Sequence, residues 1–205
     1  MLPRGLYAIT PDEPDTERLL ALVQAALNGG AAIVQYRNKA AATKLRHEQA
    51  LALQRICRAA GVPLIVNDDL EIALAIDADG LHLGGEDGDL AAARSRLGPD
   101  KLLGASCYNR LELAIEARDL GADHVAFGAM YISSTKPGAI RAPLELFGQA
   151  AASVGLPAVA IGGITLDNTP PLIRAGAHAA AVISALFNAP DVTQRARDFN
   201  RLFSQ

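Results

Sequence analysis

Short apolar runs recur along the chain at regular intervals and are separated by stretches with the period of an amphipathic helix. Uncharged runs of this length are typical of parallel strands that are covered on both faces. They predict eight strands, at Leu6–Thr10, Ala32–Gln35, Leu64–Val66, Gly80–Leu83, Leu102–Ser106, Val125–Phe127, Ala158–Ile161 and Ala179–Ile183. The chain therefore reads as an alternation of strands and helices.

The stretches between these runs place apolar residues three and four positions apart, which puts them on one helix face. Such faces are predicted from Leu19, Leu20, Val23 and Leu27; from Leu53, Ile56, Cys57 and Ala60; from Leu113, Ala117 and Leu120; and, in a last helix from Asp191 to about Phe203, from Val192, Ala196, Phe199 and Phe203. Glycines stand just before several strands, where helix C-terminal caps are expected. These are Gly29, Gly30, Gly61, Gly121, Gly155 and Gly176.

Eight strand–helix units in 205 residues are close to the lower limit for a complete eightfold barrel. A doubly wound open sheet also alternates strands with helices, but the number and regularity of the units favour closure. No linker or charge block divides the chain. We therefore expect an α/β fold, a (β/α)8 TIM barrel that forms one domain over residues 1–205.

The formal net charge of −3 offers no basic surface, which argues against nucleic acid as a partner. The first residues lack the apolar core of a signal peptide, and no stretch is long enough to span a membrane. Cys57 and Cys107 match no metal or redox spacing, so we expect reduced structural thiols in a cytoplasmic protein. The sequence predicts no particular oligomeric state.

In a closed barrel the carboxyl ends of all strands converge on one face, where the chemistry of such enzymes takes place. Polar residues follow the predicted strands at this end. They are Gln35, Tyr36, Arg37, Asn38 and Lys39 after the second strand; Asn67 and Asp68 after the third; Asp87 after the fourth; Ser106 at the end of the fifth; and Ser133, Ser134, Thr135 and Lys136 after the sixth. We expect the active site at this face.

Arg37 and Lys39 are two positions apart, so their side chains point the same way on an extended segment. With Lys136 from across the mouth they would form a cationic clamp suited to a diphosphate. An isolated Arg-x-Lys, by contrast, is more often a pair of solvated loop charges.

Asp68 and Asp87 leave consecutive strands, which lie about 4.8 Å apart in a sheet, so the two carboxylates can share one ion. Oxygen ligands without His or Cys nearby suit Mg²⁺. An aspartate before an apolar periodic stretch is also a common helix N-cap. Asp69 and Asp89 are the better candidates for caps, which leaves Asp68 and Asp87 for the metal.

Gly162 and Gly163 end the seventh strand, and without a Cβ they can turn sharply and present N–H groups to an anion. With the eighth strand ending at Ile183-Ser184, they predict the phosphate site typical of eightfold barrels. A clamp, a metal pair and a separate phosphate cup imply two phosphorylated substrates and the departure of diphosphate. The four histidines are not expected to cluster, and no nucleophilic triad stands out, so acyl transfer is unsupported.

The ordered motifs resemble those of the thiamine-phosphate synthase family over nearly the whole chain. The resemblance rests on Gln-x-Arg-x-Lys at Gln35–Lys39, Asn67-Asp68, His-Leu-Gly-x-x-Asp at His82–Asp87, Gly-x-Ser at Gly104–Ser106, the Ser133–Lys136 loop, Gly-Ile-Thr at Gly163–Thr165 and Ile183-Ser184. Two positions depart from the family pattern: Ile132-Ser133 replaces Pro-Thr, and Gly85 replaces a common Gln.

The resemblance implies condensation of hydroxymethylpyrimidine diphosphate with hydroxyethylthiazole phosphate, or its carboxylated form, to thiamine phosphate and diphosphate. It assigns Arg37, Lys39 and Lys136 to the leaving group, with Mg²⁺ on Asp68 and Asp87. The pyrimidine diphosphate would contact Gln35–Lys39, Asn67, Ser106 and Lys136, and the thiazole phosphate Ser133, Ser134, Thr135, Gly163, Ile183 and Ser184.

Two alternatives stay open on the sequence. One is a thiazole tautomerase-like relative, which would share the barrel and the phosphate cup. The other is a non-catalytic protein that binds thiamine precursors. The tautomerase would not need the clamp and the carboxylate pair. The retention of Arg37, Lys39, Asp68, Asp87 and Lys136 argues against both alternatives.

Overall fold

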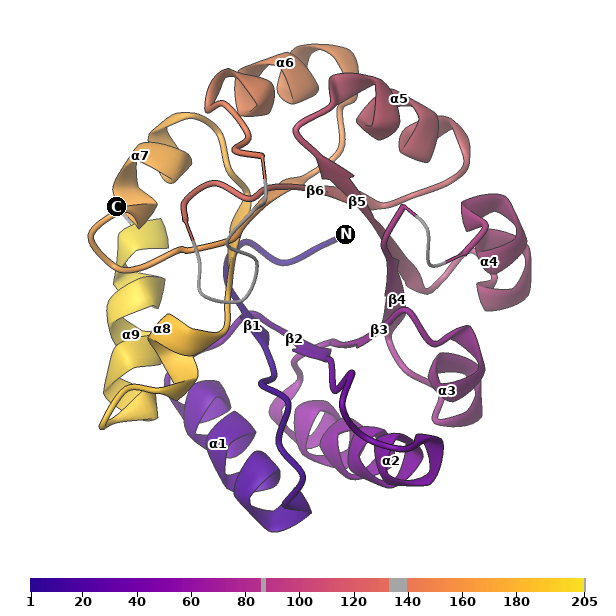
Figure 1. The fold of residues 1–205 in the computed structure, drawn as a ribbon, viewed down its shortest axis with the longest axis vertical. Helices are drawn as coiled ribbons and strands as arrows, with labels where there is room; N and C mark the ends of the chain where they lie inside the picture. Colours follow the sequence, from indigo (N-terminus) through magenta and orange to yellow (C-terminus); the bar gives the residue numbers. More distant parts are fainter. Residues whose placement is uncertain (86–87, 133–139, 205) are drawn as a thin grey trace.

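The computed structural model describes residues 1–85, 88–132 and 140–204, and within them eight parallel strands close into a barrel (Figure 1). Each strand pairs with the next in sequence, and β8 pairs with β1, with Gly5 opposite Ala179. The predicted barrel is confirmed, and closure excludes the open sheet. The strands are β1 Gly5–Ile9, β2 Ile33–Tyr36, β3 Leu64–Asn67, β4 Gly80–Leu83, β5 Leu102–Tyr108, β6 His124–Phe127, β7 Ala158–Ile161 and β8 Ala179–Val182.

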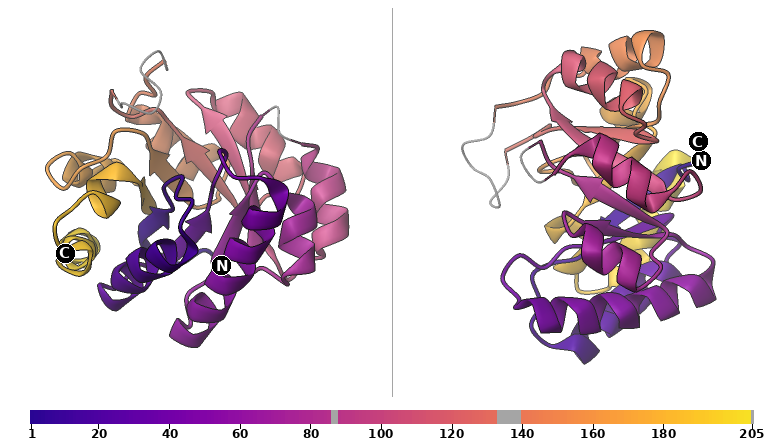
Figure 2. Two further views of the ribbon diagram at one scale, coloured as in Figure 1. Left: turned by 60° about the horizontal axis from the view of Figure 1, so that its bottom comes forward. Right: turned by 90° about the vertical axis from the view of Figure 1, so that its right-hand side faces the viewer.

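The helices form a ring around the strands (Figure 1; Figure 2). They are α1 Thr16–Asn28, α2 Thr43–Ala60, α3 Leu70–Ala75, α4 Leu90–Leu97, α5 Leu111–Asp119, α6 Glu145–Ser153, α7 Thr169–Arg174, α8 Ser184–Phe187 and α9 Val192–Phe203. None of the helices in the described part of the chain combines the length and the apolar character that a membrane crossing requires.

Asp69 and Asp89 cap the N-termini of two helices, as the sequence predicts. Asp69 caps α3, since its Oδ1 accepts a hydrogen bond from the Ile72 N–H at 3.0 Å. Asp89 caps α4 in the same way, with Oδ1 accepting from the N–H groups of Ala91 and Ala92. Since Asp69 caps α3, the neighbouring Asp68 carboxylate is not the cap of that helix.

Alternation along the strands separates two apolar layers. Residues such as Leu6, Val34 and Leu64 pack outward against the helices. Tyr7, Ile33, Ile65, Val159 and Ala179 fill the barrel interior instead. At the amino end of the barrel, Leu2 is only 2% exposed and its carbonyl is hydrogen-bonded to His178 Nε2, so the first residues plug the barrel there. This leaves the carboxyl end as the open one.

Two sequence predictions need correction. Ala60 is exposed at the end of α2, whereas Leu53 and Cys57 on the same predicted face are buried. The apolar period continues to Ala60, but the helix ends there at Gly61, whose φ of 68° is left-handed. Strand β5 also runs on to Tyr108, beyond the predicted end at Ser106, through an irregularity in its pairing with β6.

The cap on α4 gives a test of this local structure. Asp89→Ala removes the acceptor for two helix N–H groups and is expected to lower the free energy of unfolding by about 1 kcal/mol. For a chain of this length that corresponds to a fall in Tm of about 2–4 °C, measured by calorimetry. Asp89→Asn keeps a side-chain acceptor and is the matched control, and equal losses in both variants would contradict the capping role.

Candidate active site

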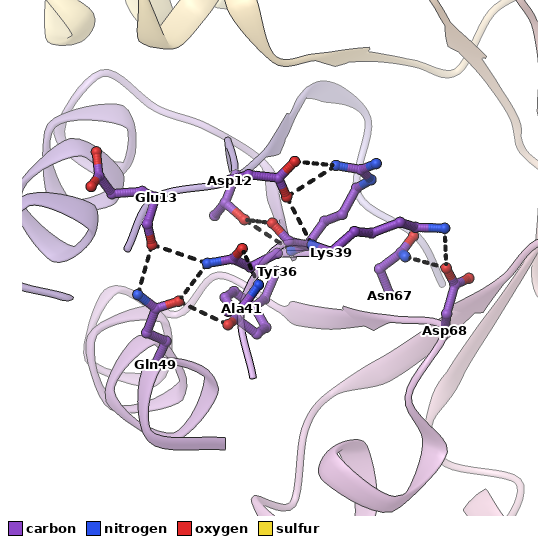
Figure 3. Close-up of polar contacts among 11 residues, drawn as sticks. Asp12, Glu13, Tyr36, Lys39, Ala41, Gln49, Asn67 and Asp68 are labelled. Carbon is purple, nitrogen blue, oxygen red and sulfur yellow. Dashed lines mark hydrogen bonds and ion pairs between the residues drawn. The ribbon is translucent and has the colours of Figure 1, made fainter. Parts of the chain in front are cut away.

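Charged side chains join the loops that follow β1, β2 and β3 at the carboxyl end of the barrel (Figure 3). The Lys39 ammonium lies 2.9 Å from Asp68 Oδ2, and Arg37 Nη1 lies 3.4 Å from both carboxylate oxygens of Asp12. The predicted clamp residues Arg37 and Lys39 are therefore both at the mouth, and each faces a carboxylate. An incoming anion would compete with these carboxylates for the two cations.

Asp12 belongs to this arrangement, although the sequence reasoning missed it. Besides facing Arg37, its Oδ1 accepts a hydrogen bond from the Lys39 backbone N–H at 2.8 Å. Thr10 reinforces the same junction, because its hydroxyl donates to the Arg37 carbonyl and accepts from the Arg37 N–H, both at 2.9 Å. The sequence does contain a signal for Asp12, because it follows the first predicted strand in the same way as the other polar residues follow theirs.

Tyr36 and Asn38 point toward helix α2. The Tyr36 hydroxyl donates to Gln49 Oε1 at 2.9 Å, and Asn38 Nδ2 donates to the same oxygen and to the Glu13 carbonyl, each at 3.0 Å (Figure 3). Burial raises the pKa of Tyr36, so its hydroxyl stays protonated at neutral pH. These contacts brace the loop that carries the cations, and a direct contact of Tyr36 or Asn38 with substrate stays a prediction.

Asp68 adopts a left-handed backbone conformation, with φ of 61°. A non-glycine residue there costs about 1 kcal/mol. The conformation is held by the Asp68 N–H, which donates to the His82 carbonyl at 2.9 Å, and by Asn67 Nδ2, which donates to Asp68 Oδ2 at 2.6 Å. The result is a half-buried carboxylate that already faces one cation, Lys39, at the mouth.

A pocket of about 270 Å³ opens beside this carboxylate and is lined by Lys39, Asn67, Asp68, Asp69 and Arg46, among others. Arg46 reaches it from α2 and lies 3.4 Å from Asp69 Oδ2. Its buried Nε has no hydrogen-bond partner among the residues that the structure describes. Arg46 was not predicted as a site residue because it lies on a helix, whereas the predicted residues follow the ends of strands.

Gln35 and Ser106 face the barrel interior. Gln35 Nε2 donates to the Tyr7 hydroxyl at 2.9 Å, and Ser106 Oγ lies 2.9 Å from His82 Nε2. The expectation that the histidines do not cluster is wrong for His82 and His124, because their ring centroids are 5.6 Å apart. Neighbouring strands bring together side chains that lie far apart in the sequence, and the apolar run predicted for β6 began only after His124.

Both imidazoles are held neutral. Burial lowers the pKa of His82 to about 4. Burial also lowers the pKa of His124 well below its ordinary value, with smaller contributions from the positive charge that His82 and His178 would carry. At neutral pH neither ring adds charge to the site.

At the other side of the mouth, Gly162 and Gly163 adopt positive φ values of 97° and 64°. A Cβ at Gly163 would lie 2.6 Å from the Ile132 carbonyl oxygen and 2.8 Å from that of Tyr131, so only glycine fits this approach to the loop after β6. Within the described ranges, the Gly163 N–H donates no backbone hydrogen bond. Ile183 is half-buried after β8, and Ser184 is exposed at the start of α8.

The predicted site residues Asp87, Ser133, Ser134, Thr135 and Lys136 lie outside the described residues. Among the described residues, no three His, Cys, Asp or Glu side chains are grouped as metal ligands. The described part of the site therefore consists of three cations with their carboxylate partners, the inward-facing polar side chains of Gln35 and Ser106, and the turn at Gly162 and Gly163.

Comparisons with known proteins agree in one family. The sequence model of the family described as thiamine monophosphate synthase matches residues 6–186. A thiamine-phosphate synthase of Methylobacillus flagellatus is 58% identical over 201 residues, which are 98% of this chain and 96% of that protein. One from Thiobacillus denitrificans is 56% identical over 202 residues, with the same coverage of both chains.

Solved structures give the same result for the fold. The thiamine phosphate pyrophosphorylase from Pyrococcus furiosus superposes with a TM-score of 0.84 at 36% identity, covering 98% of this chain and 95% of that one. A 3-hexulose-6-phosphate synthase superposes with a TM-score of 0.72 at 20% identity, covering 97% and 99% of the two chains, and at that identity it shows the fold alone.

The buried imidazoles make the stability of the barrel depend on pH. His124 is neutral in the folded chain but takes up a proton near pH 6.5 once unfolded, so the unfolded state binds more protons below that pH. The free energy of unfolding is therefore expected to fall as pH is lowered below about 6.5. His124→Gln should reduce the dependence of the unfolding free energy on pH, measured by urea denaturation at pH values from about 8 to about 5. His47→Gln, at an exposed position, should not reduce it. Equal slopes in all three proteins would contradict the assignment.

Proposed function

The chain belongs to the thiamine monophosphate synthase family and is a transferase of thiamine biosynthesis, and from this premise we propose how the barrel mouth carries out the reaction. The substrates are hydroxymethylpyrimidine diphosphate and hydroxyethylthiazole phosphate, or its carboxylated form. The C–O bond to the diphosphate breaks first, and the thiazole nitrogen then captures the pyrimidine-stabilised cation. The observation that supports this proposal is the Lys39–Asp68 pair at the mouth, in which a cation that we assign to the diphosphate lies beside a carboxylate that we assign to the metal.

Negative charge grows on the diphosphate as the C–O bond breaks, and cations placed beforehand stabilise it most. Arg37 and Lys39 supply two such charges, and we assign a third to Lys136. Their carboxylate partners keep them in place before the substrate arrives, since Asp12 binds both the Arg37 side chain and the Lys39 backbone. The substrate diphosphate then replaces Asp12 and Asp68 as their anionic partner.

Asp68 fits a magnesium site in its chemistry. It is a carboxylate that faces a cation in the structure, with the amide of Asn67 on the same oxygen. Oxygen ligands of this kind suit Mg²⁺, which keeps waters and takes substrate phosphates as further ligands. We assign the second carboxylate to Asp87. When bound, Mg²⁺ supplies positive charge that stabilises the departing diphosphate.

We assign the remaining residues by position. The amides of Gln35 and Asn67 and the Ser106 hydroxyl face inward at the top of the barrel, which suits contacts with the pyrimidine and its diphosphate. Gly163, Ile183 and Ser184 form the cup for the thiazole phosphate, and the Ser133–Thr135 loop contacts the rest of that substrate. We further propose that the enzyme acts in the cytoplasm, on two phosphorylated small molecules.

The direct test is incubation of the purified protein with both substrates and Mg²⁺, with thiamine phosphate measured by chromatography. Asp68→Asn removes one ligand charge and should raise the Mg²⁺ concentration for half-maximal activity about tenfold. The control is Asp77→Asn, because Asp77 is also an aspartate paired with cations, Lys101 and Arg58, but lies before β4. Full activity in excess chelator would refute the magnesium requirement, whereas absence of product under every condition would refute the reaction.

The phosphate cup is tested at Gly163. Gly163→Ala would press against the carbonyls of Tyr131 and Ile132 and shift the cup, so the KM for thiazole phosphate is expected to rise about tenfold, equivalent to roughly 1.4 kcal/mol. Gly61→Ala is a matched control, since Gly61 has a φ of 68° but nothing lies within 4 Å of an added Cβ. It should lower Tm alone. If both variants leave both KM values unchanged, the cup lies elsewhere.

A further inference from the structure

Three polar side chains meet inside the barrel directly below the mouth. Ser106 on β5 lies between the strands that carry His82, on β4, and His124, on β6. His82 is 7% exposed and His124 is fully buried. The only hydrogen bond of these two rings among the described residues joins His82 Nε2 to Ser106 Oγ at 2.9 Å. The proposed reaction gives neither histidine a role.

Gly104 makes room for both rings. A Cβ at this position would clash with His124 Nε2 and with His82 Nδ1, so these two nitrogen atoms face the same small hollow. Neither atom has a hydrogen-bond partner within the described part of the chain. Buried ring nitrogens without hydrogen-bond partners are costly to keep, which argues for a role of the two imidazoles beyond packing.

We infer that His82, supported by His124, is a positioning residue that makes the Ser106 hydroxyl a hydrogen-bond donor to the pyrimidine diphosphate. This inference rests on the proposed function, in which Ser106 contacts that substrate. His82 does not touch the substrate itself and acts through Ser106.

The direction of the hydrogen bond follows from the chemistry of the groups. A neutral imidazole carries one N–H and one bare nitrogen. When His82 carries its proton on Nε2, it donates to Ser106 Oγ and leaves the hydroxyl proton free for the substrate. Diphosphate oxygens only accept hydrogen bonds, so a serine that contacts them must donate. With the proton on Nδ1 instead, Ser106 would have to donate to His82 and could offer the substrate nothing.

His124 favours the productive tautomer of His82. Its Nε2 faces the hollow that His82 Nδ1 also faces. With the proton of His124 on Nε2, a proton on His82 Nδ1 would place two N–H groups beside the same hollow without an acceptor for either among the described residues.

The test compares two amides at position 82. His82→Gln places an amide N–H near the former Nε2 and can still donate to Ser106, whereas the shorter His82→Asn cannot reach it. Steady-state kinetics should give a KM for the pyrimidine diphosphate that rises about tenfold in His82→Asn and stays within about twofold in His82→Gln. The KM for thiazole phosphate should stay unchanged in both variants.

A double-mutant cycle with Ser106→Ala separates positioning from general packing. If His82 acts through Ser106, His82→Asn should have almost no further effect once the hydroxyl is gone. His178→Gln is the control, because His178 is hydrogen-bonded at the opposite end of the barrel and its loss should lower Tm without changing either KM. If His82→Asn does not fold, His124→Asn enters the same cycle in its place.

The outcomes distinguish failure of the His82 inference from failure of the proposed contact between Ser106 and substrate. Additive effects of His82→Asn and Ser106→Ala, or equal losses in His82→Gln and His82→Asn, overturn the inference and leave the proposed function in place. A Ser106→Ala variant with unchanged kinetics overturns the proposed contact of Ser106 with substrate, and the inference with it.

Discussion

Strict alternation of side chains along short strands in a closed sheet is the constraint on which the rest of this structure depends. Along each strand one residue points inward and the next outward, and the pairing register shifts only near the end of β5, between Ser106 and Tyr108, among the strands described. Gln35 and Tyr36 are neighbours in sequence, yet one bonds Tyr7 in the interior and the other bonds Gln49 on a helix. One strand thus supplies side chains both to the barrel interior and to the helix layer.

Among the described residues, the cations Arg37 and Lys39 at the mouth each face a carboxylate without substrate. Lys39 faces Asp68 and Arg37 faces Asp12, so the clamp is not a bare positive patch. Exposed pairs of this kind contribute little to stability, about 0–1 kcal/mol. The pairs instead hold the cations in position. A polyanion that replaced the carboxylates as their partner would break only these weak pairs, so little free energy would be lost.

The fold and half of this site could be predicted from sequence for one physical reason: both depend on local pattern. Apolar runs and the Asp69 and Asp89 caps are local signals, and so is the position of Arg37, Lys39 and Asp68 after a strand. The Asp12 contacts, the Arg46 guanidinium and the His82–His124 pair depend on register between strands and on helix packing. Contacts of this kind join segments that lie far apart in the sequence, and the spacing of residues along one strand does not predict them.

The seam between β1 and β8 has a consequence for how the chain folds. Gly5 pairs with Ala179, so the ring cannot close until the chain has been made almost to its end. Contacts this far apart in sequence carry a large entropy cost of loop closure and slow the folding of a domain. The Asp12 loop follows one strand of this seam and Ser184 follows the other. The residues proposed to bind substrate on both sides of the mouth therefore come together only with this last pairing. A nascent chain that stops short of β8 would have helices and strands but would lack part of the proposed site.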